Sequence, residues 1–554
     1  MSPIAEPLGG LLPQFSDTPP ANPPSPATPP ARRAEAAAVV AGLALTVLPI
    51  AWLGGVQFGG MDGGVLSNAA WMTYLGYRPY ADFDTQCPPF YFIAGWLAFA
   101  LFGVRWMSLV YFAALFASIT FGWHWLLLRR LPLELGWRLA IALATQALTL
   151  VPIGWGHYNQ LTAIAAALFL TAALGWTARP PDWRGWLHLT FATALLSLMK
   201  PNVAGLLIAC AFPIVAAQRG WFWKSCASLV VAAGMAIACM SIFGMSPVDM
   251  LRSYLGTGNR LANRENFANC LYLTGPVESG PTLCATVPLV IALLCLSVAA
   301  FANRDWLRRY WRLMALAWVG FAASFAGMCT NAEHNMVDLP VLVVGVIALT
   351  AWRQPAWLAG KWGTASLAFV FAGTAQLLLI AGFITVNRTR IHDIGAYKFW
   401  EPGATQSIQD PVFFRGVAGG PILRTVLSQV NDVLRVTDDK NTTIYFGPRM
   451  DFGYAAYGIE PPRGLPLWWT GLGEVSTAVQ MEQVRRFQQL DPKVCIFLVD
   501  DYTWMPSALL EHLRDNYDLY QTGLLSVHIR KGPWRAVPVK KVEGPGSAIR
   551  KQNP

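Results

Sequence analysis

Long apolar runs separated by short basic loops are the feature that most constrains this chain. A membrane-spanning helix needs about 20 predominantly apolar residues, and apolar runs of this order recur between residues 34 and 386. Charged residues make up only 13% of the 554 residues, about half the share of a typical soluble domain. The pattern therefore predicts an α-helical polytopic membrane protein.

The Lys and Arg residues between the runs orient them in the membrane. Short loops rich in Lys and Arg stay in the cytoplasm, so Arg32 and Arg33 place the start of the chain inside. The run Pro88–Gly103 is short and aromatic, and we expect it to lie in the outer interface, because a crossing there would invert every later loop. The net charge of +10 is thus a topology signal and does not indicate a nucleic-acid partner.

Assigning the loops to the two sides of the membrane in this way predicts eleven spans, with the chain after residue 386 outside. The predicted spans are Ala34–Leu53, Trp106–Leu128, Leu139–Ile153, Leu161–Trp176, Leu187–Met199, Val203–Ala217, Ser225–Phe243, Val287–Phe301, Met314–Met328, Leu339–Trp352 and Ala365–Val386.

Three parts are predicted along the chain. Residues 1–33 form a Pro-rich cytoplasmic tail that is too poor in apolar residues to pack. Residues 34–386 form the transmembrane domain, whose first outer loop, 54–105, carries two interfacial helices. In residues 387–554 "TTIYFG", "VCIFLVDD" and "SVHIRK" predict strands and "SALLEHLRDNYDLY" predicts a helix. We therefore expect a small extracytoplasmic α/β domain there.

The nine Cys show no CxxC spacing, and most lie inside apolar runs, where Cys behaves as a small hydrophobic residue. Cys270 and Cys284 differ, because they flank a hydrophilic loop that should face outward. In an oxidising compartment they form either a structural disulfide or two free thiols, and the sequence leaves both open.

Acidic residues stand out in the first outer loop. Asp62 precedes "GGVLSNAAWMTYLGY", a predicted interfacial helix, and Asp82 and Asp84 lie in the turn-rich "RPYADFDTQCPP". Local sequence allows a structural role for each: Asp62 as a helix N-cap, and the other two as Asx-turn residues. The alternative is a cluster of functional carboxylates at the membrane rim.

The stretch "MDGGVLSNAAWMTYLGYRPYADFDTQCPPFYFIAGWLAFALFG" resembles the first outer loop of the GT-C membrane glycosyltransferases. That superfamily includes protein mannosyltransferases that use dolichyl-phosphate-mannose and the lipid A aminoarabinose transferases. "LLSLMKPN", "EHNMVDLPVLVV" and "YFGPRMDFGYAAYGIEPP" are similar to later parts of the pattern. The positions that match in the first loop are Asp62, Gly76, Pro79, Tyr80, Asp82, Phe83, Pro88, Pro89 and Leu101–Phe102–Gly103.

This resemblance implies a GT-C-like fold and an inverting transfer of a sugar from a polyprenyl phosphate to an acceptor hydroxyl at the outer face. Asp62 matches the catalytic acidic residue of the family, and Asp82 or Asp84 would orient the acceptor or support the base. Many members carry a second acidic residue where this chain has Gly63. We therefore expect a single-base mechanism without a metal or other cofactor.

The departing lipid phosphate needs positive charge. The outer-face candidates are Arg78, Lys200, Arg252, Arg260 and Arg264. An ionisable residue between two apolar runs suggests function, which favours Lys200, although its side chain could equally extend along the bilayer to the interface. The three later Arg residues also suit a solvated surface.

Three residues in outward turns are candidates for acceptor contact or proton transfer. These are His157, Glu333 and His334. A lone loop His is more often uninvolved, although His is the natural proton carrier near neutral pH. Trp468 and Trp469 suit either stacking on a sugar or insertion into the membrane.

The function predicted from sequence is thus a glycosyltransferase of a bacterial inner membrane. Its partners would be a polyprenyl-phosphate-linked sugar, membrane lipids and a glycan, lipid or protein acceptor. The alternatives are a multi-span lipid or saccharide transporter or flippase, a polysaccharide polymerase or ligase, and a non-enzymatic scaffold. A transporter would show inverted repeats and ionisable residues at mid-membrane, whereas the charges here cluster near the ends of the runs.

Overall fold

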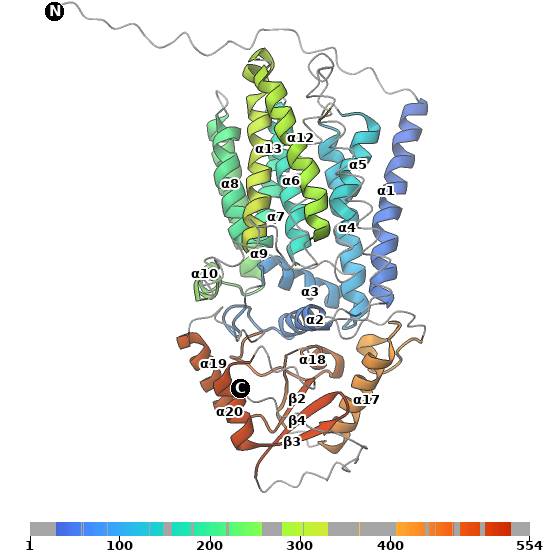
Figure 1. Cartoon of the computed structure of the whole chain (residues 1–554), viewed down its shortest axis with the longest axis vertical. Coiled ribbons are helices and arrows are strands. Elements are labelled where there is room, and N and C mark those ends of the chain that lie inside the picture. Colours follow the sequence, from blue (N-terminus) through green and yellow to red (C-terminus); the bar gives the residue numbers. More distant parts are fainter. Residues whose placement is uncertain are drawn as a thin grey trace, which may run out of the picture.

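The computed structural model combines a bundle of apolar helices with an α/β domain at one end (Figure 1). It describes residues 29–56, 58, 60–85, 87–131, 133–147, 158–178, 182–217, 221–256, 280–302, 304–330, 365, 406–437, 442–448, 450–467, 469, 477–498 and 505–532. All structural statements below concern these residues.

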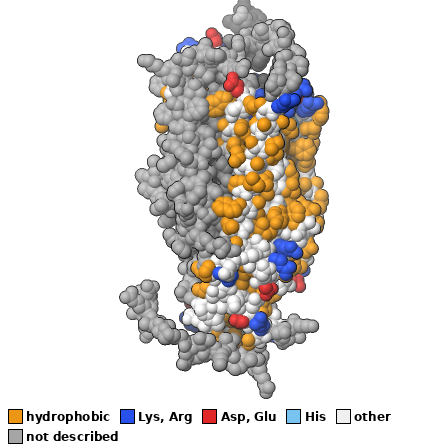
Figure 2. Space-filling view, turned by 90° about the vertical axis from the view of Figure 1, so that its right-hand side faces the viewer, with side chains coloured by type: hydrophobic (Ala, Val, Ile, Leu, Met, Phe, Trp, Pro, Cys, Tyr) orange, Lys and Arg blue, Asp and Glu red, His pale blue; other side chains and the backbone are white. Residues whose placement is uncertain are grey.

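The helices of the bundle run roughly parallel to one another (Figure 1). They are α1 (Pro29–Val56), α4 (Trp106–Leu128), α5 (Leu135–Ala147), α6 (Tyr158–Ala178), α7 (Trp183–Met199), α8 (Pro201–Ala216), α9 (Phe222–Ile242), α12 (Gly280–Ala302) and α13 (Arg304–Thr330). Among the described residues, α1, α4 and α9 are both long and apolar enough to cross a bilayer. On the described part of the face shown in Figure 2, hydrophobic side chains cover the middle of the bundle and charged side chains gather towards its two ends. The prediction of a polytopic helical membrane fold is confirmed.

The predicted spans agree with these helices to different degrees. The predicted span Trp106–Leu128 matches α4 at both ends. The predicted span Leu187–Met199 ends where α7 ends, but α7 begins four residues earlier, at Trp183. The predicted span Leu139–Ile153 is helical only to Ala147 within the described part. Leu339–Trp352 and nearly all of Ala365–Val386 lie outside the described residues, so the count of eleven stays a prediction.

Ion pairs tie helix ends together on the side of the bundle away from the α/β domain. Glu35 of α1 lies 3.1 Å from Arg129 and 3.9 Å from Arg138, and Arg130 pairs with Asp182. Asp182 also caps α7, because its carboxylate accepts the backbone N–H of Gly185 at 2.7 Å. These contacts fix the order in which α1, α4, α5 and α7 meet at that end.

Polar side chains also link helices inside the bundle. His124 Nε2 lies 3.0 Å from Thr171 Oγ1, and Gln146 donates to Thr120 Oγ1 at 3.1 Å. All four side chains are buried, and such interhelical hydrogen bonds are a common means of helix association in membranes. They join α4 to α5 and α6.

Two short helices lie across the end of the bundle that faces the α/β domain, α2 (Gly60–Tyr74) and α3 (Pro89–Phe102) (Figure 1). At about 1.5 Å per residue the 14 residues of α3 extend only about 21 Å, less than the hydrocarbon core of a bilayer. Helices α2 and α3 pack so closely that a Cβ on Gly95 of α3 would lie 2.5 Å from the Cβ of Ala70 of α2. Helix α3 is too short to cross a bilayer, and the interfacial placement of Pro88–Gly103 stays a prediction.

The α/β domain is built on a four-stranded sheet of order β1-β2-β4-β3. β1 (Ile444–Phe446) runs parallel to β2 (Val494–Leu498), while β4 (Leu525–Arg530) is antiparallel to both β2 and β3 (Tyr517–Thr522). The other elements of this domain are the 3-10 helix η3 (Val412–Phe414) and α17 (Pro421–Val436), α18 (Phe452–Tyr457), α19 (Thr477–Leu490) and α20 (Ser507–Asn516).

The central strand β2 explains the layers of this domain. All five of its residues are buried, as expected for a strand covered on both faces. Val494 and Ile496 belong to the cluster that includes Leu423 and Val426 of α17, whereas Cys495 and Phe497 pack with the cluster of α19 and α20. The sheet therefore lies between helices on both faces.

One sequence prediction is wrong here. The helix expected over "SALLEHLRDNYDLY" ends at Asn516, and its last four residues begin strand β3. Tyr517 is buried and its hydroxyl donates to the carbonyl of Pro492 at 2.8 Å. Pairing with β4 across a turn at Gly523 (φ 59°) overrides the local helical pattern.

Candidate functional site

The loop between α1 and α4 meets the α/β domain along α2, against which α18 packs. Asp62 is the third residue of α2, so it lies in the first turn of the helix and not at the N-cap position. A carboxylate in the first turn is favoured by the partial positive charge of the helix N-terminus. The side chain of Asp62 itself lies outside the described part of the structure.

Asp82 stabilises its own turn. Its carboxylate accepts the backbone N–H of Arg78 at 2.8 Å and lies 3.4 Å from the Arg78 guanidinium. Its backbone carbonyl accepts the N–H of Gly464 from the α/β domain at 2.8 Å. The side chain is only 14% exposed. Asp82 therefore has a structural role, but it is not the Asx-turn expected from sequence, because its carboxylate accepts the N–H of a residue four positions earlier and not two positions later.

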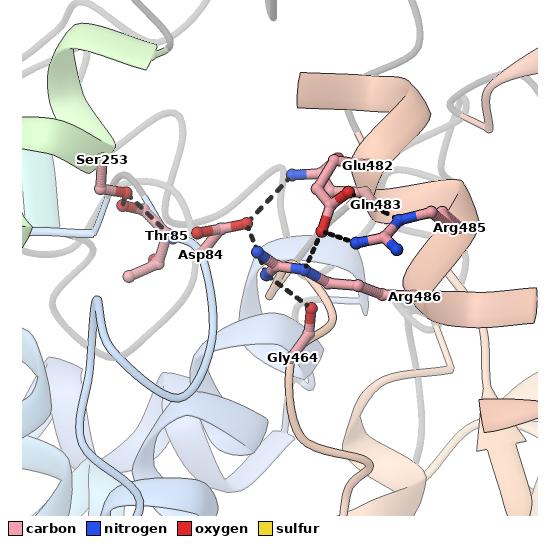
Figure 3. Close-up of polar contacts among 8 residues, drawn as sticks. All are labelled: Asp84, Thr85, Ser253, Gly464, Glu482, Gln483, Arg485 and Arg486. Carbon is pink, nitrogen blue, oxygen red and sulfur yellow. Dashed lines mark hydrogen bonds and ion pairs between the residues drawn. The ribbon is translucent and has the colours of Figure 1, made fainter. Parts of the chain in front are cut away.

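Asp84 points instead to the α/β domain (Figure 3). Its carboxylate lies 3.7 Å from the guanidinium of Arg486 and 3.5 Å from the amide nitrogen of Gln483, both on α19. Arg486 also donates to Glu482 at 3.1 Å and to the carbonyl of Gly464 at 3.2 Å. Hydrogen bonds from Arg485 and Arg486 lower the pKa of Glu482 to about 2, so this network is charged at neutral pH.

Two tyrosines hold the loop in shape. The hydroxyl of Tyr77 lies 2.6 Å from the carbonyl of Pro461 and 2.8 Å from the carboxylate of Glu460, and it can donate to one of them at a time. Burial, and then the hydrogen bond with Glu460, raise the pKa of Tyr77 to about 12. Tyr80 has a positive φ of 69° and donates to the carbonyl of Cys87 at 2.5 Å.

Helix α10 (Pro247–Gly256), which follows α9, also contacts this loop. Ser253 of α10 donates to the carbonyl of Thr85 at 2.6 Å, and its hydroxyl lies 3.3 Å from the Thr85 backbone nitrogen (Figure 3). Residues 77–87, which we call the bracket loop, are thus held by α10 on one side and by the α/β domain on the other. These partners lie far away in the sequence, and no local motif marked them.

The residues predicted to bind the lipid phosphate differ in position and in exposure. Arg78 lies in the bracket loop with 63% of its side chain exposed. Lys200 joins α7 to α8 in an extended conformation (φ −153°, ψ 96°), and its side chain is half-buried. Because α7 begins at the end of the bundle where Asp182 pairs with Arg130, Lys200 at its other end lies on the side of the short helices α2 and α3. Arg252 is exposed and lies 3.5 Å from Asp249.

Several predicted residues cannot be placed. His157, Arg260, Arg264, Cys270, Glu333, His334 and Trp468 lie outside the described residues. Cys284 belongs to α12, but its side chain is not described, so the disulfide with Cys270 stays a prediction. Trp469 is buried in the α/β domain, where its indole N–H donates to the hydroxyl of Tyr445 at 2.5 Å.

A metal site would need several convergent ligands. Within the described part of the chain, no three His, Cys, Asp or Glu side chains gather in this way.

The arrangement matches the GT-C fold: a polytopic helical bundle with two short helices across one end, between the bundle and an α/β domain. No protein-family model and no curated protein sequence matches the chain. Among solved structures, ArnT from Cupriavidus metallidurans in the apo state aligns over 91% of this chain and 100% of its own, with 12% identity and a TM-score of 0.50. The likeness therefore shows a shared fold along nearly the whole chain.

Two further structures give lower scores. ArnT from the same organism bound to undecaprenyl phosphate has 12% identity, the same coverage and a TM-score of 0.46. An oligosaccharyltransferase from Archaeoglobus fulgidus has 11% identity and a TM-score of 0.40, over 90% of this chain and 73% of its own.

Proposed function

We propose that this chain is a membrane glycosyltransferase that moves a sugar from a polyprenyl-phosphate donor to an acceptor hydroxyl at the outer face of a bacterial inner membrane. The observation that carries the proposal is the position of Asp62, in the first turn of an interfacial helix where the bundle meets the α/β domain of a GT-C fold. A donor with a lipid tail and an acceptor from water can meet at this level.

In the proposed reaction the carboxylate of Asp62 removes the proton from the acceptor hydroxyl. The acceptor oxygen then forms a bond to the anomeric carbon from the side opposite the phosphate. The bond between that carbon and the phosphate oxygen breaks, and its electron pair leaves with the lipid phosphate, so the configuration inverts. General-base catalysis of this kind contributes about 10²–10⁴-fold to a rate.

The departing phosphate needs a cation close to the membrane surface. Lys200 is our first candidate, because it is half-buried and follows α7 at the end of the bundle where α2 and α3 lie. A Lys at the edge of a bilayer can hold its ammonium group at the phosphate level while its alkyl chain remains in apolar surroundings. Arg78, Arg260 and Arg264 are further candidates. His157, Glu333 and His334 remain candidates for contact with the acceptor.

Asp82 and Asp84 are assigned supporting roles in this proposal. Both carboxylates have partners that shape the bracket loop or hold the α/β domain above it. They support the base by fixing the surroundings in which the acceptor binds. The proposed mechanism uses no metal ion.

The test is transfer of radiolabelled sugar by the purified protein from a panel of polyprenyl-phosphate sugars to a lipid and glycan extract. Asp62→Asn should reduce turnover by about 10²–10⁴-fold. Asp432→Asn is the matched control, because Asp432 is 70% exposed on α17 of the α/β domain, and it should keep full activity.

Each other outcome has a definite meaning. If Asp62→Asn is as active as the parent protein, the base is another group, and Asp82 and Asp84 are examined next. If neither protein transfers sugar from any donor, the transferase proposal is wrong, and a vesicle transport assay tests for a flippase.

A further inference from the structure

The chain segment just before Asp62 is held by an aromatic cluster. The ring of Phe58 meets three other rings edge to face, at centroid distances of 4.9 Å for Trp106, 4.8 Å for Phe414 and 5.2 Å for Phe452. All four side chains are at most 1% exposed. We call these four residues the aromatic seat. Edge-to-face pairs of this kind fix geometry as well as bury apolar surface.

The two glycines after Asp62 pack against residues of the aromatic seat. A Cβ on Gly63 would lie 3.3 Å from the indole of Trp106. A Cβ on Gly64 would lie 3.5 Å from the ring of Phe452 and 3.6 Å from the Phe452 backbone nitrogen. The first turn of α2 therefore lies against Trp106 at Gly63 and against Phe452 at Gly64.

The seat is assembled from three separate parts of the protein. Phe58 belongs to the link after α1, and Trp106 begins α4 and donates its indole N–H to the carbonyl of Gly54 in α1 at 2.9 Å. Phe414 and Phe452 come from the α/β domain and pack on each other at 5.6 Å. The α/β domain thus provides half of the seat that holds the turn bearing Asp62.

We propose that Phe452 is a positioning residue for Asp62, so that the α/β domain takes part in catalysis by holding the base in place. This inference rests on the proposed function, in which Asp62 is the base. A base must come within about 2.6–3.2 Å of the proton that it removes, and a misplacement of about 1 Å can cost about 100-fold in rate. Phe452 acts through the backbone of α2 and is not assigned any contact with substrate.

The test compares kcat and KM among variants. Phe452→Ala should lower kcat about 10- to 100-fold and leave the KM for the donor within about threefold, because the donor-binding cations are unchanged. Phe452→Leu fills most of the same space and should recover most of the lost kcat.

A matched control separates positioning from general loss of packing. Phe487 is also fully buried in the α/β domain, but it packs with Tyr445, Trp469 and His512, away from α2. Phe487→Ala should destabilise the domain while kcat of the folded protein stays near the parent value. Equal losses of kcat in Phe452→Ala and Phe487→Ala would overturn the inference.

A second measurement does not depend on activity. A nitroxide spin label on Asp62→Cys reports the mobility of the first turn of α2 through the width of its spectrum. Adding Phe452→Ala should sharpen the spectrum, and adding Phe487→Ala should leave it unchanged. An unchanged spectrum with Phe452→Ala would show that Phe452 does not hold this turn.

The two proposals can fail separately. An active Asp62→Asn protein would remove the assigned base, whatever Phe452 does to the spin label. An inactive Asp62→Asn protein together with a Phe452→Ala protein of parental kcat would leave the base in place and reject the positioning role.

Discussion

The carboxylate of Asp84 lies 3.7 Å from the guanidinium of Arg486, across a sequence separation that spans most of the chain (Figure 3). The pair joins the bracket loop of the membrane unit to α19 of the α/β domain. Both side chains are 40% exposed, so solvent screens their attraction. A half-exposed ion pair of this kind contributes up to about 1 kcal/mol.

A double-mutant cycle measures that contribution. Asp84→Asn, Arg486→Gln and the double variant should give a coupling energy of about 0.5 kcal/mol in chemical unfolding at low salt. The coupling should decrease in 1 M salt, where the Debye length is about 3 Å. Asp432 and Arg435, a far more exposed pair at 3.9 Å, should show almost no coupling. A coupling above about 2 kcal/mol would mean that the first pair is shielded from solvent.

Gly95 marks the closest approach between α2 and α3. A Cβ there would lie 2.5 Å from the Cβ and 2.9 Å from the Cα of Ala70, so Gly95→Ala should destabilise the protein by about 1–3 kcal/mol. Thermal unfolding in detergent measures the loss. Gly122→Ala in α4 is the control, because a Cβ there meets nothing within 4 Å. The double variant Gly95→Ala, Ala70→Gly should recover part of the stability; no recovery would place the clash elsewhere.

Much of this fold could be predicted from the sequence, because apolar runs and basic loops are local signals. The run Trp106–Leu128 matches α4 at both ends, and three of the four strands were expected. Strand β3 was not, because Tyr517–Thr522 looks like the end of a helix until β4 is available to pair with it. Long-range pairing decides such segments.

Part of the candidate site could likewise be predicted from the sequence, and part could not. Asp62 and the bracket loop carry a recognisable local pattern, so the sequence could point to them. Their partners could not be predicted, since Arg486 and Ser253 are joined to the loop only by the fold. The aromatic seat was missed for a related reason: Phe58, Phe414 and Phe452 show no shared periodicity.

Tyr77 anchors the segment before α19 to the bracket loop. Its hydroxyl reaches the carbonyl of Pro461 and the carboxylate of Glu460, and the guanidinium of Arg463 lies 4.4 Å from its ring centroid. Tyr77→Phe keeps the ring but leaves the buried carbonyl of Pro461 without this donor, which should cost about 1–3 kcal/mol. Chemical unfolding measures this cost. Tyr520→Phe on the exposed strand β3 is the control and should be neutral; equal effects would mean that the Tyr77 hydroxyl contributes nothing specific.

His528 should make the stability of the α/β domain depend on pH. It is 7% exposed on β4, with its ring 5.3 Å from that of Phe497, and burial lowers its pKa from 6.5 to about 4. Between these two values the unfolded chain binds a proton that the folded chain does not. Stability should therefore fall as the pH is lowered from 6.5 to 4, by about 3 kcal/mol in total, and the contribution should level off below pH 4.

Chemical unfolding of the full-length protein at several pH values between 7 and 4 tests this expectation. His528→Asn should remove about 3 kcal/mol of the pH dependence, because no proton is then taken up on unfolding at that position. His512→Asn is the comparison, since His512 is less buried and its pKa is lowered by burial and by the charge of Arg530. It should flatten the curve less. If stability depends on pH equally in the parent protein and in His528→Asn, then His528 binds its proton in the folded state near its ordinary pKa. Its ring would then be in contact with water.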